Sequence, residues 1–236
     1  VRIGHNGKFR FRLRITGLAA HSSRPEFGVN AIYRAADFIN AIRSMWETSL
    51  EREIPHTKPR VRLRPPIAVT MIEGGTAPNQ IPAEVEMYVD RRVVYGEDFE
   101  EVRSRIYQMV EGINKAHNMA HGDLLEERGF ELKAEVIEER LNRPAYMLPL
   151  DTEQGKRLFE AAVKAVREAT GEDPPIVYGT GYTDAELLYS MAGIPTVIIG
   201  PGEAAHTPDE YVRLEKLKQA FASYIGLVLN LLAPRT

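Results

Sequence analysis

A histidine near the end of the chain stands where a metal ligand would be useful. Residues 198–211 read IIGPGEAAHTPDEY, so His206 follows an apolar run and a glycine-containing loop. In open α/β sheets, ligands bind just beyond the carboxyl ends of the strands. Asp209 and Glu210 are close enough in the sequence to orient the imidazole, as the partners of metal-bound histidines do. A loop histidine can equally cap a helix, so His206 by itself leaves both interpretations open.

A second histidine, His21, lies in the run GLAAHSSRPEFGVN at residues 17–30. Held between the end of a strand and the start of a helix, its imidazole could donate a hydrogen bond to a developing oxyanion. A surface-loop histidine without a catalytic role shows the same local pattern. The motif therefore nominates His21 without deciding its role.

Two further runs carry groups that suit substrate recognition. In GGTAPNQIPAEVEMYVDRR, residues 74–92, Asn79 ends one arm of a hairpin and Arg92 ends the next strand. An amide and a guanidinium suit a substrate carbonyl and carboxylate, although both groups also serve purely structural roles. Residues 179–184, GTGYTD, offer backbone amides that could cradle an anion. They lack the lysine and the spacing of a P-loop, so nucleotide binding is not expected.

The elements that position these residues fall into two groups, of which the first is rich in alternating strands. Residues 8–16 alternate between apolar and polar side chains, which predicts a half-buried strand. Further strands are predicted at 67–72, 85–89 and 132–136, and helices at 29–46 and 99–113. The first helix is indicated by apolar residues at near-helical spacing, Ile32, Tyr33, Ala36, Ile39 and Trp46. The order predicts a ferredoxin-like split βαβ domain, a four-stranded antiparallel sheet with two helices. Residues 49–66 contain four prolines and many charges, which predicts an exposed connection.

The second group follows a different pattern. Helices are predicted at 151–171, 184–191 and 214–232, with a short strand at 176–178 and an apolar strand at 195–199. An almost wholly apolar strand is typical of a parallel sheet that is buried on both faces. Two strands and three helices cannot enclose a doubly wound sheet by themselves. We therefore expect one domain at 1–142 and, at 143–236, the C-terminal part of a doubly wound α/β domain whose N-terminal half is absent.

Composition narrows the possible partners and ligands. With 236 residues and 44% hydrophobic side chains, the chain is expected to fold. A net charge of -3 gives no overall attraction to nucleic acid or anionic membranes, and no apolar run reaches the ~20 residues of a membrane span. We therefore expect neither nucleic acid nor membrane as a partner, and a cytoplasmic location. Because cysteine is absent, any metal must be held by His, Asp or Glu.

Taken together and in order, these motifs resemble the zinc metallopeptidase family that includes acetylornithine deacetylase, succinyl-diaminopimelate desuccinylase, aminoacylase and glutamate carboxypeptidase. The matching runs are G-x-A-A-H-S-S-x-P-x-x-G-x-N-A, G-G-x-x-x-N-Q-I-P-A with D-R-R, Y-G-x-G-x-T-D-A, and G-P-G with A-H-T-P-D-E-Y. They cover nearly the whole chain. The resemblance implies hydrolysis of an amide bond in N-acyl amino acids or small peptides that carry a free carboxylate.

The resemblance also implies what recognises the substrate. The domain at 1–142 matches the family's lid and dimerisation domain, in which Asn79 and Arg92 match residues that hold the substrate's carbonyl and carboxylate. Gly181 and Tyr182 fall in a turn that contacts the substrate. The implied partner is a second copy of the chain, bound through the first helix and an edge strand of the lid.

The implied metal centre is only partly present. His206 matches a ligand of one of two zinc ions, which cobalt or manganese could replace, and His21 matches a lid histidine that polarises the scissile carbonyl in the partner subunit. The family's H-x-D motif and its acidic ligands would precede Val1, and the His121-Gly122-Asp123 run is expected to be a polar loop rather than their substitute. We therefore expect the chain alone to be inactive. The alternative is a metal-free dimerisation or small-ligand-binding module.

Overall fold

The computed structural model describes residues 1–201 and 208–232 and divides into two compact units. The first, here called the sheet unit, comprises Gly7–Arg52 and Arg64–Pro144. The second, here called the terminal unit, comprises Val1–Asn6, Glu53–Leu63 and the chain from Ala145 onward. The chain therefore crosses between the units at 6/7, 52/53, 63/64 and 144/145. A lid at 1–142 followed by a catalytic segment at 143–236 stays a prediction.

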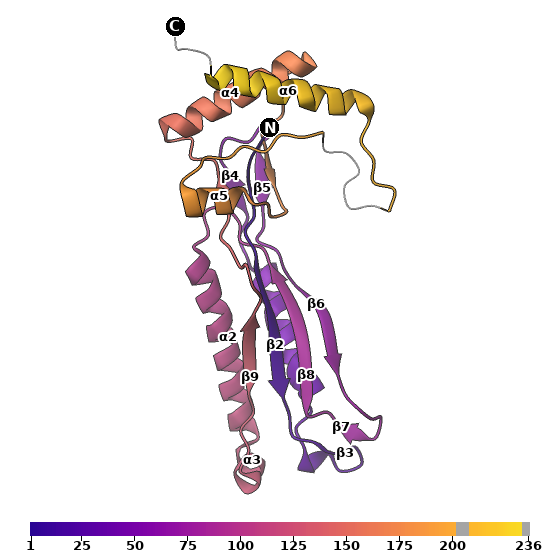
Figure 1. Ribbon diagram of the computed structural model, residues 1–236. Helices are drawn as coiled ribbons and strands as arrows, with labels where there is room; N and C mark the ends of the chain where they lie inside the picture. Colours follow the sequence, from indigo (N-terminus) through magenta and orange to yellow (C-terminus); the bar gives the residue numbers. More distant parts are fainter. Residues whose placement is uncertain (202–207, 233–236) are drawn as a thin grey trace. The chain divides into compact units, whose positions relative to one another are not determined.

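The sheet unit has the predicted split βαβ arrangement (Figure 1). Its main sheet is antiparallel with the strand order β6-β8-β2-β9, and β3 pairs with β7 in a separate small sheet. The elements are β2 (Phe9–Thr16), β3 (Ala20–His21), η1 (Pro25–Phe27), α1 (Ala31–Glu47), β6 (Ile67–Gly74), β7 (Gln80–Ile81), β8 (Glu84–Arg91), α2 (Phe99–Ala120), α3 (Gly122–Arg128) and β9 (Ala134–Glu138).

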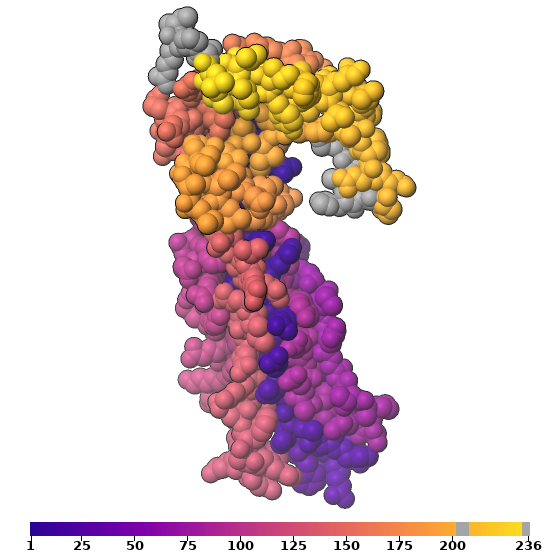
Figure 2. All heavy atoms as spheres, in the orientation of Figure 1, coloured from indigo at the N-terminus to yellow at the C-terminus, as the bar shows by residue number. Residues whose placement is uncertain are grey.

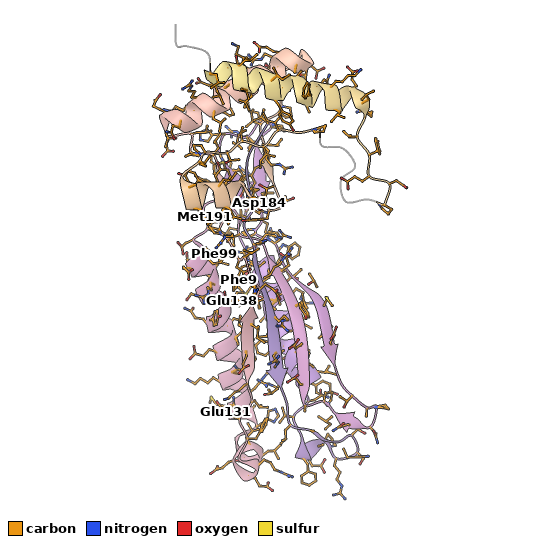
Figure 3. The ribbon with its side chains drawn as sticks, viewed as in Figure 1. Phe9, Phe99, Glu131, Glu138, Asp184 and Met191 are labelled. Atoms are coloured by element: carbon orange, nitrogen blue, oxygen red, sulfur yellow. The ribbon has the colours of Figure 1, made fainter. Side chains whose placement is uncertain are left out.

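Strand β2 shows why this sheet forms. Its apolar residues, Phe9, Phe11, Leu13 and Ile15, are buried in one core with residues of β8, α1 and α2. Phe9 meets Phe99 of α2 edge to face, with ring centroids 5.8 Å apart (Figure 3). The alternate side chains reach the other face of the sheet, where Arg10 pairs with Asp90 at 2.8 Å and Arg14 with Glu86 at 3.0 Å. The arginine row is thus part of a cross-strand ion-pair ladder.

Helix α1 forms where it was predicted, but it buries a different face. The side chains that enter the core are Ala31, Ala35, Phe38 and Ile42. Tyr33 is 74% exposed and Ile32 43% exposed, so the predicted apolar face lies largely outside the core. Apolar residues occur on both sides of this helix, and the side with small alanines can approach the sheet closely. The spacing alone did not distinguish the two sides.

The terminal unit is built around a small sheet with the order β10-β1-β11, in which β1 is antiparallel to β10 and parallel to β11. Helix α4 packs along α6 (Figure 1). Among the described residues, no helix combines the length and apolarity needed to cross a bilayer. The elements are β1 (Arg2–His5), β4 (Arg52–Ile54, which begins on the last residue of the sheet unit's first segment), β5 (Val61–Leu63), β10 (Tyr146–Met147), α4 (Glu153–Thr170), β11 (Val177–Gly179), α5 (Ala185–Ala192) and α6 (Leu214–Leu232).

The apolar strand predicted at 195–199 does not form. This segment has a single β-bridge, between Ile198 and Arg2, and its side chains are only half-buried. A strand needs a neighbouring strand along its length, and among the described residues the segment's only β-bridge is the one with Arg2. The prediction was therefore wrong for the described chain.

The connection predicted at 49–66 is also more ordered than expected. It forms the paired strands β4 and β5, and Ile54 and Thr57 are buried. The Thr57 hydroxyl donates to the carbonyl of Ile54 at 2.9 Å and accepts from the amide of Val61 at 3.0 Å. Prolines have no backbone N–H to donate, so the hydroxyl of Thr57 supplies hydrogen bonds within this turn. The hairpin was not predicted because a segment rich in prolines and charges is typical of an exposed connection.

Candidate functional site

His21 and Asn79 lie together at one end of the sheet unit. The pairing of β3 with β7 sets His21 opposite Gln80, and the amide of Ser22 donates to the carbonyl of Asn79 at 3.0 Å. The exposed His21 ring is fixed through Nδ1, which accepts from the backbone amide of Ser23 at 3.2 Å and lies 2.8 Å from the Ser23 hydroxyl. Because Nδ1 accepts, the proton of the neutral ring is on Nε2. His21 thus presents an N–H donor at the surface.

The loop that carries His21 folds back on itself through two glycines. Leu18 and Val29 exchange backbone hydrogen bonds of 2.8 and 2.9 Å. A Cβ on Gly17 would lie 2.3 Å from the Val29 carbonyl oxygen, and one on Gly28 would lie 2.7 Å from the Cβ of Ala20. Only glycine allows these close approaches. Residues 17–30 therefore form a closed loop whose two ends are adjacent.

Arg92 follows β8 and is held by its neighbours. Its backbone amide donates to the Pro66 carbonyl at 2.9 Å. Its guanidinium meets Asp90 in two places, with Nε 2.8 Å from Oδ1 and Nη2 3.1 Å from Oδ2. Asp90 also accepts from Arg10. A carboxylate shared between two arginines fixes the planar fork of Arg92 while part of its side chain stays exposed to solvent.

The register of the sheet places Arg92 far from His21 and Asn79. Phe9 pairs with Arg91 at one end of β2 and β8, and Thr16 pairs with Glu84 at the other. His21 and Asn79 are joined to the Thr16 end, where Figure 1 shows β3 and β7. The eight residues of β8 span about 26 Å at ~3.3 Å per residue. Within one copy of the chain, one small ligand cannot contact both Arg92 and His21.

Gly181 and Tyr182 belong to the terminal unit, in the turn between β11 and α5. The Tyr182 hydroxyl donates to Glu186 Oε2 at 3.2 Å, which fixes the ring. Among the described residues, a Cβ on Gly181 would meet no atom within 4 Å, so this part of the structure leaves its backbone open to a ligand. Asp184, labelled in Figure 3, and Glu186 follow directly at the start of α5. These two carboxylates disfavour the binding of an anion at the backbone amides of residues 179–184, which the sequence had suggested.

His5, which was not among the predicted site residues, is buried beside this turn. Its ring lies edge-on to Tyr182, with centroids 5.2 Å apart. Nδ1 is 2.9 Å from the carbonyl of Asn6, and Nε2 has no hydrogen-bond partner among the described residues. Burial lowers the pKa of His5, and the nearby carboxylate of Glu186 opposes this shift. No motif singled out His5, because its neighbours in the run R-I-G-H-N-G are mostly polar or glycine and do not indicate a buried side chain.

The predicted metal ligand His206 lies outside the described residues. Within the described part of the chain, no three His, Asp or Glu side chains come close enough to hold a metal ion. The prediction of a polar loop at the His121 run was wrong: the seven residues after His121 form helix α3, and the described structure gathers no ligand group there. A dinuclear centre needs several ligands. The described residues therefore do not form one.

Comparison with known proteins decides the family. The profile of peptidase family M20/M25/M40 matches residues 67–230, and that of the peptidase dimerisation domain matches residues 3–118.

This chain belongs to peptidase family M20/M25/M40.

Two curated relatives show how far this membership reaches. The chain is 26% identical over 235 residues to succinyl-diaminopimelate desuccinylase of Thioalkalivibrio sulfidiphilus, covering 98% of this chain and 54% of the relative. It is 28% identical over 211 residues to acetylornithine deacetylase of Edwardsiella ictaluri, covering 88% of this chain and 48% of the relative. The chain thus spans about half the length of the curated relatives that it matches. The resemblance inferred from the motifs is confirmed.

Solved structures agree on the fold. A tripeptidase from Staphylococcus aureus superposes with a TM-score of 0.68 at 22% identity, covering 96% of this chain and 52% of that one. Human carnosine dipeptidase 1 gives a TM-score of 0.61 at 14% identity, covering 97% and 55%. At such identities the likeness shows the fold alone. It confirms the predicted α/β class of this M20 chain.

Proposed function

We propose that this chain is the lid and the distal catalytic segment of a metal-dependent amidohydrolase. The substrates are N-acyl amino acids or small peptides with a free carboxylate. The single observation that carries the proposal is the match to the M20/M25/M40 profile over residues 67–230. The relatives named above are a deacetylase, a desuccinylase and two peptidases, and each of these names describes cleavage of an amide bond.

The two ends of the sheet unit have different tasks in this proposal. At one end, the free Nε2–H of His21 donates to the scissile carbonyl as negative charge develops on it, and Asn79 assists. At the other end, Arg92 binds the substrate carboxylate. The length of β8 separates the two groups by about 26 Å. His21 and Asn79 therefore serve the active site of a second copy of the chain.

A homodimer supplies that second copy. Strand β6 is an edge of the main sheet, and an uncovered edge invites another strand. Along it, Met71 and Ile72 are about half exposed, and α1 adds the exposed Ile32 and Trp46. In this proposal, two copies share the surface formed by the edge strand and the apolar face of the helix. Light scattering of the chain at micromolar concentration should give twice the monomer mass; a monomer would contradict this part of the proposal.

The metal ligands must come mostly from elsewhere. We propose that zinc, or cobalt or manganese in its place, is held by His206 together with residues outside this sequence. The described residues form no ligand cluster, so the 236-residue chain is proposed to be inactive alone. Mass spectrometry of the purified chain should find less than one zinc per chain, whereas two per chain would contradict this account. A cytoplasmic location stays a prediction.

The decisive test uses the complete enzyme, meaning this chain together with the region that supplies those ligands. Release of free amine is followed for N-acetyl amino acids, N-succinyl amino acids and dipeptides, with and without a chelator. We expect hydrolysis that the chelator stops and zinc restores, and none by the 236-residue chain. Activity that survives the chelator would refute the proposal. Absence of turnover with every substrate would favour the alternative, a metal-free dimerisation or ligand-binding module.

A further inference from the structure

Arg34 is a buried cation that no sequence motif singled out. Arg34 is only 2% exposed. Burial lowers the pKa of its guanidinium to about 10, so the group stays charged at neutral pH. Nη1 donates to the carbonyl of Thr16 and, at 3.3 Å, to that of Lys133. Nη2 donates to Asn114 Oδ1 at 2.9 Å. A buried charge is tolerated only when such partners surround it.

The remaining contact of Arg34 determines which nitrogen of His117 carries the proton. Arg34 Nε lies 2.8 Å from His117 Nδ1. Because a guanidinium nitrogen only donates, Nδ1 must accept, and the proton of the neutral imidazole is on Nε2. Nε2 lies 2.9 Å from Asp37 Oδ2 and donates to it. Asp37, His117 and Arg34 thus form one directional chain of hydrogen bonds from α1 to α2 and back.

This series of hydrogen bonds ends at the loop that carries His21. Thr16, whose carbonyl Arg34 holds, is the last residue before the loop of residues 17–30. Arg34 itself is in the first turn of α1, which begins where the loop ends and is capped by the side chain of Asn30. One guanidinium therefore ties the entry of the loop to its exit. A cavity of about 640 Å³ lies beside it, with Ser22 and Gln80, the neighbours of His21 and Asn79, in its lining.

We propose that Arg34 is a positioning residue for His21, and that His117 keeps Arg34 in place. This inference rests on the catalytic role proposed for His21. By closing the loop at its base, Arg34 limits the motion of β3 and β7, so Nε2 of His21 is presented in one orientation. A misplacement of about 1 Å can cost a catalytic group a hundredfold in rate, so the tie at the base of the loop matters.

A metal site at His117 is a rival explanation for the cluster, and the geometry opposes it. His117 is on α2, His121 follows the last residue of that helix, and Asp37 is within reach of His117. Nδ1 of His117 already accepts from Arg34, so coordination through Nε2 would leave the ring without a proton on either nitrogen. The described residues also contain no group of three ligands. The cluster is therefore a hydrogen-bonded clamp.

The first test needs no substitution. Two-dimensional ¹H–¹⁵N spectra of the side-chain nitrogens of the ¹⁵N-labelled chain report which nitrogen of each histidine carries the proton. We expect His117 to be the Nε2–H tautomer at pH 7.5, with a slowly exchanging Nε–H signal from Arg34. A proton on Nδ1 of His117 would overturn the inference, because Arg34 could then not donate to it.

The second test compares two substitutions at His117. His117→Gln keeps an acceptor for Arg34 and a donor for Asp37, whereas His117→Phe keeps the ring beside Phe38 and loses both. Hydrogen exchange of the Leu18 and Ser22 amides should quicken about tenfold in the Phe variant, relative to amides of β8, and stay close to wild type in the Gln variant. Equal exchange in both variants would overturn the clamp. Arg103→Met, which removes an ion pair to Glu138 elsewhere on α2, controls for general destabilisation.

The third test is kinetic and uses the complete enzyme. His117→Phe should lower kcat about tenfold with KM nearly unchanged, and His117→Gln should restore most of the rate, because a positioning defect acts in the transition state. Arg103→Met should leave both constants unchanged. If His21→Ala abolishes turnover while His117→Phe does not change it, only this inference fails. If His21→Ala has no effect, the proposed role of His21 fails instead.

Discussion

The two units differ in how completely each buries its own apolar residues. In the sheet unit, one core joins β2 and β8 to α1 and α2, and its centre is closed to solvent. In the terminal unit, the described core is small, with Ile3, Leu148 and Ile176 at its centre. Its helix α6, which is yellow in Figure 2, leaves apolar side chains exposed at helical spacing: Leu214, Leu217, Phe221, Tyr224, Val228 and Leu232.

This difference shows where each unit's stability comes from. A helix that is apolar on more than one side is normally buried on more than one side. The sheet unit supplies its own second layer, because α1 and α2 cover its sheet. For the terminal unit, the exposed stripe of α6 is consistent with our proposal that a further region of polypeptide completes the catalytic domain. The following predictions test this contrast, from the largest expected effect to the smallest.

Removing a core side chain of the sheet unit should be the most damaging change. Phe38 is wholly buried between α1 and the sheet. Phe38→Ala is expected to lower the free energy of unfolding by about 3–5 kcal/mol, since it removes a large buried ring and leaves a cavity. Urea unfolding followed by circular dichroism measures the loss. A change below about 1 kcal/mol would mean that this core is not closed as described.

The partly exposed Arg92 should matter for activity rather than for stability. In the complete enzyme, Arg92→Ala should lower kcat/KM for substrates with a free carboxylate. The expected loss of transition-state stabilisation is about 2–5 kcal/mol, because a buried charge pair with the substrate is lost. Arg10→Ala is the matched control, because Arg10 contacts the same carboxylate of Asp90. Equal losses in both variants would indicate a role in the ion-pair ladder instead of in substrate binding.

His5 should make the terminal unit sensitive to mild acid. Burial lowers its pKa when the chain is folded, while the unfolded chain titrates near the ordinary value of about 6.5. The unfolded state therefore binds the proton first, so stability is complete above about pH 6.5 and falls as the pH drops toward the folded-state pKa. His5→Phe should flatten this dependence between pH 7.5 and 5, as measured by the midpoint of thermal unfolding. An unchanged pH dependence in the variant would assign it to other groups.

The exposed stripe of α6 should be the least sensitive to substitution. Phe221 is 65% exposed, so Phe221→Ser is expected to change the free energy of unfolding of this chain by about 0.5 kcal/mol or less. In the complete enzyme the same change should cost several times more, because the proposed missing region would cover the ring. Equal small effects in both proteins would remove α6 from that interface.

The sequence was informative wherever local pattern and packing agree. Strict alternation over residues 8–16 predicted β2, and the order of elements predicted the sheet, because each strand needs only one apolar face. The strand at 195–199 failed for the opposite reason, since an apolar run specifies a strand only when neighbours are present to pair with it. The buried face of α1 was missed because apolar spacing fits two faces of that helix.

The candidate site was predictable by residue type but not by arrangement. The motifs nominated His21, Asn79 and Arg92, and the strand predicted at 85–89 already separates Asn79 from Arg92, but nothing in their order places His21 beside Asn79. That pairing depends on strand register, which the sequence does not state. Arg34 was missed because a single arginine in an amphipathic helix reads as a solvated charge. Its burial depends on partners distant in the sequence, among them Asn114 and His117.

The two ends of the sheet unit lie side by side. Lys8 and Arg143 exchange backbone hydrogen bonds of 2.9 Å each, and a Cβ on Gly7 would lie 2.3 Å from the backbone of Pro144. Only the short excursion at Glu53–Leu63 leaves the sheet unit between these two ends. Segments whose two ends lie close together tolerate insertion and exchange, so residues 7–144 could be exchanged as one piece, which would carry Glu53–Leu63 with it. Recombination at the junction of Gly7 and Pro144 would provide a route by which the proposed hydrolase acquires a different sheet unit.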